Sequence, residues 1–98
     1  MRILARSTLR DFWEQNPDAE TGLKTWFTKI KKAEYTTPAE IIKDFKSADY
    51  VHGFIVFNIA KNKYRLVTAF RYDKQICYIH FVDIHAAYDK IDFKTLGI

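Results

Sequence analysis

The strongest constraint on the fold is the stretch of residues 54–84, where apolar and polar side chains alternate with a period of two. Such alternation predicts β-strands that bury one face. The dipeptides Lys61-Asn62 and Asp73-Lys74 interrupt the pattern and suit two-residue hairpin turns, the first because Asn tolerates a positive φ. We therefore predict three antiparallel strands, over residues 54–60, 63–72 and 75–84.

These two turns also predict how the strands pair and which side chains share a face. The expected cross-strand pairs are Asn58–Arg65, Arg65–Val82, Val67–His80 and Arg71–Ile76. One face is then apolar and holds Ile55, Phe57, Ile59, Leu66, Thr68, Phe70, Cys77, Ile79 and Phe81. The opposite, open face holds Val56, Asn58, Lys63, Arg65, Val67, Arg71, Tyr78, His80 and Val82. A slip of one residue would bury Arg65 and His80, and the cost of burying charge opposes it.

The preceding half of the chain predicts helices that cover the apolar face. Ser7 is expected to cap a first helix, Asn16-Pro17 to begin a second, and the capping-box spacing from Thr37 to Glu40 to begin a third that ends near Lys46. Residues 2–5 suit a short edge strand, and residues 47–53 a connection. The expected architecture is one α+β domain over residues 1–98, an antiparallel sheet with helices packed on one face.

Charge and composition narrow the class of protein. The formal net charge of the 98-residue chain is +4, and its surplus falls between residues 50 and 82, inside the hairpins. This favours an acidic partner such as nucleic acid. Cys77 is the single cysteine, which suits a reducing compartment. Because no apolar run is long enough for a membrane span, we expect a cytoplasmic protein without a membrane partner.

The open face combines cations, imidazoles and a phenol, and the sequence has no glycine-rich loop. Such a face is suited to binding and cleaving a phosphodiester. Metal-free RNA cleavage needs a base for the 2′-OH, a cation for the phosphorane charge and an acid for the leaving oxygen. The candidate catalytic residues are Arg65 for the charge, His80 and His85 for proton transfer, and Tyr88 for base stacking or for proton transfer if nearby cations lower its pKa. The candidate RNA-binding residues are Asn58, Lys61, Lys63, Arg71 and Lys90.

Each candidate also has a plainer interpretation. In this interpretation the lysines are solvated charges beside turns, and Arg65 and His80 are surface residues. His85 then caps a short terminal helix over residues 86–91, and Tyr88 covers the end of the sheet. His85, Asp83 and Asp89 match no metal-ligand spacing, so we expect neither a metal site nor a cofactor.

Three segments are similar to a known family: FNIAKNKYRLV (57–67), CYIHFVDIHAAYDKID (77–92) and MRILARSTLRDFWE (1–14). They resemble the HigB toxins, which are mRNA interferases of the RelE-like superfamily. The most specific elements are Asn58-x₃-Asn62-x₂-Arg65 and His85-x₂-Tyr88-Asp89. This sequence departs from the family at His80, where relatives tend to carry Arg, so His80 could share the acid–base work or Arg71 could supply the charge.

The resemblance implies the toxin of a type II toxin–antitoxin system with a small RelE-like, microbial-RNase-like fold. It implies cleavage of mRNA on the 70S ribosome and neutralisation by a HigA-type antitoxin with a DNA-binding helix-turn-helix. We expect attack by the substrate's own 2′-OH, which leaves a 2′,3′-cyclic phosphate. Two alternatives stay open: a toxin of this fold that binds a protein such as gyrase without chemistry, and a plain RNA-binding module.

Overall fold

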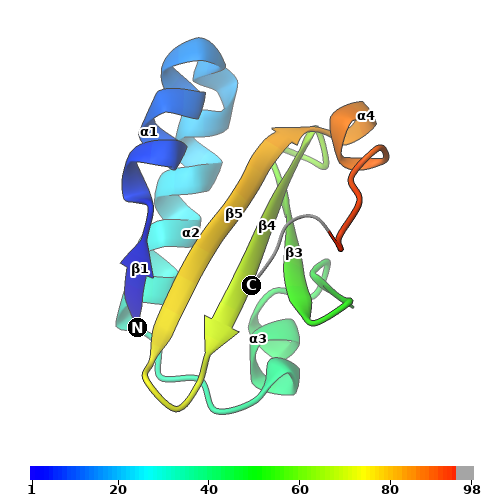
Figure 1. The fold of residues 1–98 in the computed structure, drawn as a ribbon. Helices are drawn as coiled ribbons and strands as arrows, with labels where there is room; N and C mark the ends of the chain where they lie inside the picture. The colour runs from blue at the N-terminus through cyan, green and yellow to red at the C-terminus, as the bar shows by residue number, and fades with distance from the viewer. Residues whose placement is uncertain (95–98) are drawn as a thin grey trace.

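The structure, a computed structural model, describes residues 1–94 (Figure 1). Its elements are β1 (Arg2–Leu4), α1 (Arg6–Gln15), the 3₁₀ turn η1 (Pro17–Ala19), α2 (Glu20–Lys32), α3 (Pro38–Asp44), β2 (Asp49–Val51), β3 (Phe54–Ile59), β4 (Tyr64–Arg71), β5 (Ile76–Ile84) and α4 (His85–Tyr88).

The five strands form one sheet in the order β1-β5-β4-β3-β2. The neighbouring strands are antiparallel except β1, which pairs with β5 in parallel. The sheet is therefore mixed: the three predicted strands are antiparallel, and the predicted edge strand joins them in parallel, because the helices return the chain so that β1 and β5 run in the same direction. At the opposite edge, β2 occupies part of the predicted connection over residues 47–53, and its three residues are too few to show an alternating pattern.

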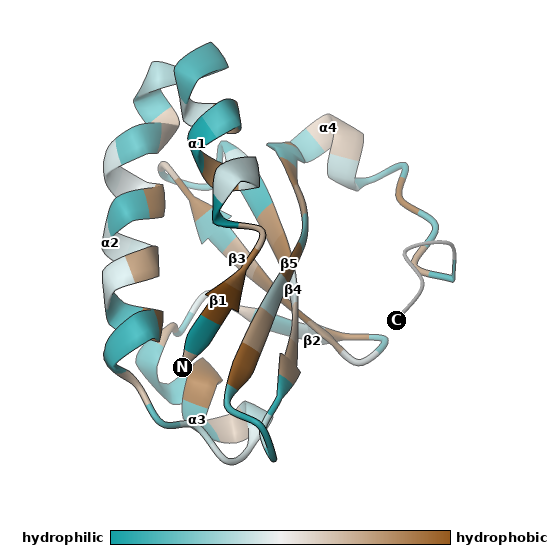
Figure 2. Cartoon of the chain, turned by 60° about the vertical axis from the view of Figure 1, so that its left-hand side comes forward, coloured by the Kyte–Doolittle hydropathy of each residue, from teal (hydrophilic) through white to brown (hydrophobic). Residues whose placement is uncertain are grey.

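Helices α1, α2 and α3 pack on one side of the sheet, which we call the helix face. Figure 2 shows hydrophilic colours along the outer sides of α1 and α2 and hydrophobic colours on the strands. The core between these layers includes Leu9, Leu23, Trp26, Ile30, Ile41, Phe57, Leu66 and Cys77. Gly22 lets α2 approach β3, because an added Cβ would lie 3.0 Å from the Ile59 side chain. No helix within residues 1–94 is long and apolar enough to cross a membrane.

The helix starts differ from the sequence predictions at two of three places. Helix α1 begins at Arg6 and not after Ser7, because Ala5 adopts a left-handed conformation with φ of 72° and makes the turn. The Asn16 side chain donates back to the Phe12 carbonyl, and Pro17 opens a 3₁₀ turn before α2. The third start is confirmed: Thr37 caps α3 by accepting the Glu40 backbone N–H, although α3 ends at Asp44, short of Lys46.

Both hairpin turns lie where they were predicted. Lys61 and Asn62 occupy the centre of the first turn with φ of 55° and 71°, and the Lys63 N–H donates to the Ala60 carbonyl. The first turn places Asn58 opposite Arg65, and the second places Arg71 opposite Ile76, as expected.

A β-bulge at His80 shifts the far part of the β4–β5 register. Val67 lies opposite Phe81, and the next residue, Thr68, lies opposite Ile79, so His80 has no partner of its own on β4. The predicted pairs Val67–His80 and Arg65–Val82 are therefore wrong, and Asp83 is the residue opposite Arg65.

The bulge also exchanges the faces of two apolar residues. Phe81 packs on the side away from the helices, and Val82 contacts the main core, which reverses both predictions. His80 and Phe81 consequently lie on the same side of the sheet, because an extra residue interrupts the alternation.

The side of the sheet opposite the helices, which we call the second face, is not fully open. Phe54, Val56, Val67 and Ala69 are buried there beneath a C-terminal strap, residues 85–93, which contributes Tyr88, Ile91 and Phe93. The strap contains α4, which ends at Tyr88, earlier than the helix over 86–91 that we predicted. In Figure 1 this segment lies across the sheet from α1 and α2. The second face is therefore apolar in its middle and polar toward the β3–β4 turn.

Candidate active site

Arg65 lies on the second face, near the β3–β4 turn. It stands between Asn58 and Asp83 on the neighbouring strands. Its half-buried guanidinium donates from Nη1 to the carbonyl oxygens of Asn62, at 2.8 Å, and Tyr64, at 3.4 Å. Within residues 1–94 no ion pair with a carboxylate engages this guanidinium. Arg65 thus presents a positioned cation to any anion on this face.

His80 shares the second face with Arg65, as the alternation predicted. Its half-buried ring meets the edge of Phe54, with 5.4 Å between the ring centroids. Burial lowers the pKa of His80 below its usual value, because the surroundings favour the uncharged imidazole. At neutral pH this ring is therefore suited to accepting a proton or a hydrogen bond.

His85 begins α4 and is oriented by Asp89 one helical turn later. The His85 Nδ1 lies 3.0 Å from the Asp89 carboxylate, and both side chains are about half exposed. A proton held at Nδ1 leaves the Nε2 lone pair available toward solvent. Ile84, not His85, occupies the N-cap position, and the His85 N–H donates to the Lys63 carbonyl at the β3–β4 turn. Asp89 was absent from our candidate list, although its i,i+4 spacing from His85 indicates this contact.

Tyr88 contacts both the strap and the candidate site. Its ring packs edge-on to Phe93 at 6.0 Å and to His85 at 6.4 Å between centroids. The pKa of Tyr88 is raised, chiefly by burial and also by Asp49 and Asp89, while Arg65 opposes the rise. The possibility that nearby cations lower this pKa is therefore not realised. A phenol that stays protonated can donate a hydrogen bond or a proton, but it cannot act as a base near neutral pH.

Asp49 is a second acidic neighbour that sequence reasoning missed. It lies on β2 opposite Val56, at the edge of the second face, and it acts electrostatically on Tyr88. Its strand was not predicted, so the sequence carried no signal for placing it there.

The five candidate RNA-binding residues do not gather in one place. Asn58 lies directly opposite Arg65 and donates its amide to the Ser47 carbonyl at 3.0 Å. Lys61 is exposed in the adjoining turn, and Lys90 is exposed just after α4. Arg71 points to the same side as Arg65 but lies at the opposite end of β4, where it pairs with Asp73 at 3.3 Å.

Lys63 differs most from its predicted position. Its ammonium pairs with Asp18 of η1, to which the Tyr64 hydroxyl also donates at 2.6 Å, so it turns toward the helices and away from the open face. Hydrogen bonds from Lys63 and Tyr64 lower the pKa of Asp18 and keep that carboxylate charged. The alternation pattern fails here because Lys63 belongs to the turn and not to the strand.

Comparison with known proteins assigns the chain and its fold to a class. A family model described as "HigB_toxin, RelE-like toxic component of a toxin-antitoxin system" matches residues 19–91. The chain therefore has the small α+β fold of a RelE-like toxin.

Individual relatives agree with the family model. The chain is 30% identical over 92 residues to the mRNA interferase toxin HigB of Escherichia coli K12, an alignment that covers 91% of this chain and 88% of the relative. It is 21% identical over 94 residues to the mRNA interferase HigB of Escherichia coli O6:H1, covering 93% and 91%. The chain belongs to the HigB toxin family, and hence to the toxic components of toxin–antitoxin systems.

Proposed function

We propose that this toxin cleaves mRNA on the ribosome through the cluster of Arg65, His85 and Tyr88. The observation that carries the proposal is the Arg65 guanidinium, which forms no ion pair with a carboxylate within residues 1–94 and acts electrostatically on Tyr88, whose ring contacts the ring of His85. Relatives named mRNA interferases support the same activity.

In the proposed reaction the substrate supplies its own nucleophile. His85 Nε2 takes the proton of the 2′-OH, the 2′-oxygen attacks the adjacent phosphorus, and the bond to the 5′-oxygen breaks. Arg65 binds the phosphoryl oxygens as negative charge develops on them. Tyr88 donates a proton to the leaving 5′-oxygen, and solvent restores both side chains. The products are a 2′,3′-cyclic phosphate and a 5′-OH.

The remaining residues have supporting roles in this proposal. Asp89 keeps the His85 imidazole in the tautomer that can act as a base, and neutral His80 provides a hydrogen-bonding position further along the same face. Asn58, Lys61 and Lys90 bind the RNA near the reacting phosphate. Arg71 contacts the RNA farther from the reacting phosphate. Lys63 binds the RNA only if the RNA displaces its ammonium from Asp18.

The activity is tested by incubating the purified chain with mRNA, with and without 70S ribosomes, and mapping new ends by primer extension. We expect new 5′ ends carrying a hydroxyl, with faster cleavage when ribosomes are present. A toxin that arrests growth without producing new RNA ends would contradict this proposal and indicate a non-catalytic target.

The role of Tyr88 is tested by comparing Tyr88→Phe with Tyr88→Ala. If the phenol donates the proton, Tyr88→Phe lowers the cleavage rate about 100-fold, a typical loss for a general acid. The thermal midpoint of Tyr88→Phe should stay close to that of the unchanged protein, because the ring retains its contacts with Phe93 and His85. Full cleavage by Tyr88→Phe with slow cleavage by Tyr88→Ala would instead assign Tyr88 to base stacking.

We also propose that the partner antitoxin is of the HigA type, with a DNA-binding helix-turn-helix. The family description supports a partner antitoxin in general. The sequence of the neighbouring reading frame tests the HigA-type assignment, because it should encode a small protein with a helix-turn-helix.

A further inference from the structure

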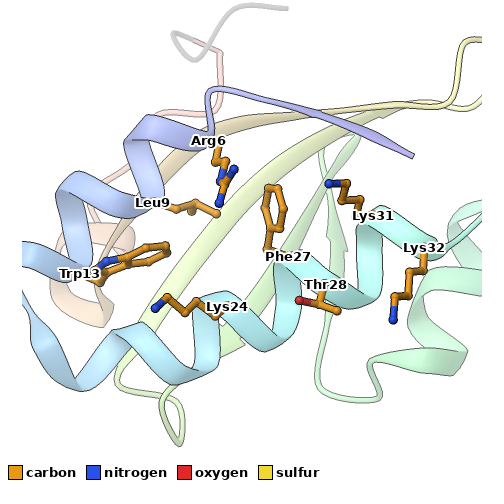
Figure 3. Close-up of a pocket in the computed structure, with 8 residues that line it drawn as sticks. All are labelled: Arg6, Leu9, Trp13, Lys24, Phe27, Thr28, Lys31 and Lys32. Carbon is orange, nitrogen blue, oxygen red and sulfur yellow. The ribbon is translucent and has the colours of Figure 1, made fainter.

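A groove between α1 and α2 lies on the outer surface of the helix layer, and the proposed reaction does not use it. Its volume is about 630 Å³, and it is lined by Arg6, Leu9, Trp13, Lys24, Phe27, Thr28, Lys31 and Lys32. Figure 3 shows Arg6, Leu9 and Trp13 of α1 on one side and Lys24 and Phe27 of α2 on the other. We call these residues the cationic groove.

The cationic groove has an apolar floor and a positive rim. Leu9 is fully buried at its base, and Trp13 and Phe27 are half-buried. The Arg6 guanidinium lies 4.9 Å from the centre of the Phe27 ring, and the Lys24 ammonium lies 5.3 Å from that of Trp13. Within residues 1–94 no acidic side chain lines the groove, although Lys24 also pairs with Glu20 at its edge. Charge complementarity therefore selects an acidic occupant.

The aromatic residues of the groove favour a protein occupant over nucleic acid. Single-stranded RNA binds aromatic residues by stacking bases on free ring faces. Here Arg6 lies over Phe27, and Lys24 lies over Trp13, so the protein's own cations already contact those faces. A protein segment can instead place an apolar side chain between Trp13 and Phe27 and carboxylates beside the cations.

A second copy of this chain is a poor match for the same surface. Two such grooves facing each other would bring Arg6, Lys24, Lys31 and Lys32 against the same cations, and like charges across an interface oppose association. We propose that the cationic groove docks an acidic, amphipathic segment of the partner antitoxin, with one apolar anchor on Leu9, Trp13 and Phe27. This proposal rests on membership of a toxin–antitoxin family and not on the cleavage mechanism.

Charge reversal at Arg6 and Lys31 tests the groove against a matched control. Both cations lie near Phe27, with Lys31 at 6.0 Å from its ring centre. The control, Lys43→Glu with Lys46→Glu, makes the same change in net charge at exposed lysines outside the groove. The probes are the antitoxin encoded beside this chain and a fluorescent single-stranded RNA, each titrated against both double variants and the unchanged toxin.

We expect Arg6→Glu with Lys31→Glu to weaken antitoxin binding about 100-fold, as reversed charges at a contact do, and the control pair to change it less than about threefold. RNA affinity and mRNA cleavage without antitoxin should be similar in the two double variants. If charge reversal unfolds the protein, Arg6→Gln with Lys31→Gln replaces it, with weaker binding and a shallower salt dependence as the expected result.

Three results would overturn the proposal. The first is equal loss of antitoxin binding in the groove and control variants, and the second is a groove-specific loss of RNA affinity with antitoxin binding intact. The third is self-association of the unchanged toxin that the groove variant abolishes, measured by sedimentation. Because cleavage is measured separately, failure of the proposed nuclease activity would leave the antitoxin result interpretable.

Discussion

Arg65→Ala should reduce mRNA cleavage by about 1,000-fold, because a guanidinium that binds the transition-state phosphoryl group contributes an effect of this size. The fold should persist, since Arg65 is half-buried and its side chain donates hydrogen bonds to the nearby carbonyls of Asn62 and Tyr64. Single-turnover cleavage of ribosome-bound mRNA measures the loss, and circular dichroism with a thermal melt checks the fold.

Two further arginine variants make the Arg65 result specific. Arg65→Lys keeps the charge but loses the planar fork that matches two phosphate oxygens, so we expect partial activity. Arg71→Ala removes an arginine from the same face at the far end of β4, where Asp73 already pairs with it, and should weaken RNA binding only slightly. Wild-type toxicity of Arg65→Ala, or equal losses in Arg65→Ala and Arg71→Ala, would refute the assigned site.

Phe54→Ala should lower the free energy of unfolding by about 3–5 kcal/mol, a usual range for removing a buried phenylalanine. Phe54 is 3% exposed and lies beneath both His80 and Phe93, with ring centroids 5.4 and 5.5 Å away. Its loss therefore removes the surface on which the strap rests, and cleavage should fall even at temperatures where the variant stays folded. Urea unfolding measures the loss of free energy of unfolding. Hydrogen exchange over residues 85–93 measures how far the strap detaches.

Phe54→Leu is the matched control, because it keeps most of the apolar volume and should retain both the strap and the activity. The tryptophans report separately on the rest of the fold, since Trp13 and Trp26 belong to the helix side. Unchanged tryptophan emission with faster exchange of the strap would show local detachment. Normal cleavage by folded Phe54→Ala would show that the strap does not position Tyr88.

Much of the sheet could be predicted because alternation and charge agree. Burying Arg65 would be costly, so the phase of β4 followed from the sequence, and the turn at Lys61-Asn62 then placed Asn58 opposite Arg65. The capping box at Thr37 was similarly readable, since its hydrogen bonds join residues only three apart. These predictions depend on local contacts and one strong energetic penalty.

The features that could not be predicted depend on contacts between residues distant in sequence, or on apolar residues that fit either face of the sheet. The bulge at His80 is invisible because Ile79, Phe81 and Val82 are apolar and could lie on either face. The strap escaped because Ile91 and Phe93 are isolated apolar residues in a polar tail, with no period to indicate what they cover. The pairing of Lys63 with Asp18 joins residues 45 apart in sequence, which no local pattern reports.

Because of the bulge, the type of side chain at position 80 does not determine how β5 pairs with β4. Residue 80 is extra to the β4 ladder, with Ile79 opposite Thr68 and Phe81 opposite Val67 on either side of it. A different side chain at this position would leave the cross-strand partners of its neighbours unchanged. An imidazole, a guanidinium or an amide can therefore occupy position 80 without a change in the register of the sheet, provided that it keeps a contact with Phe54.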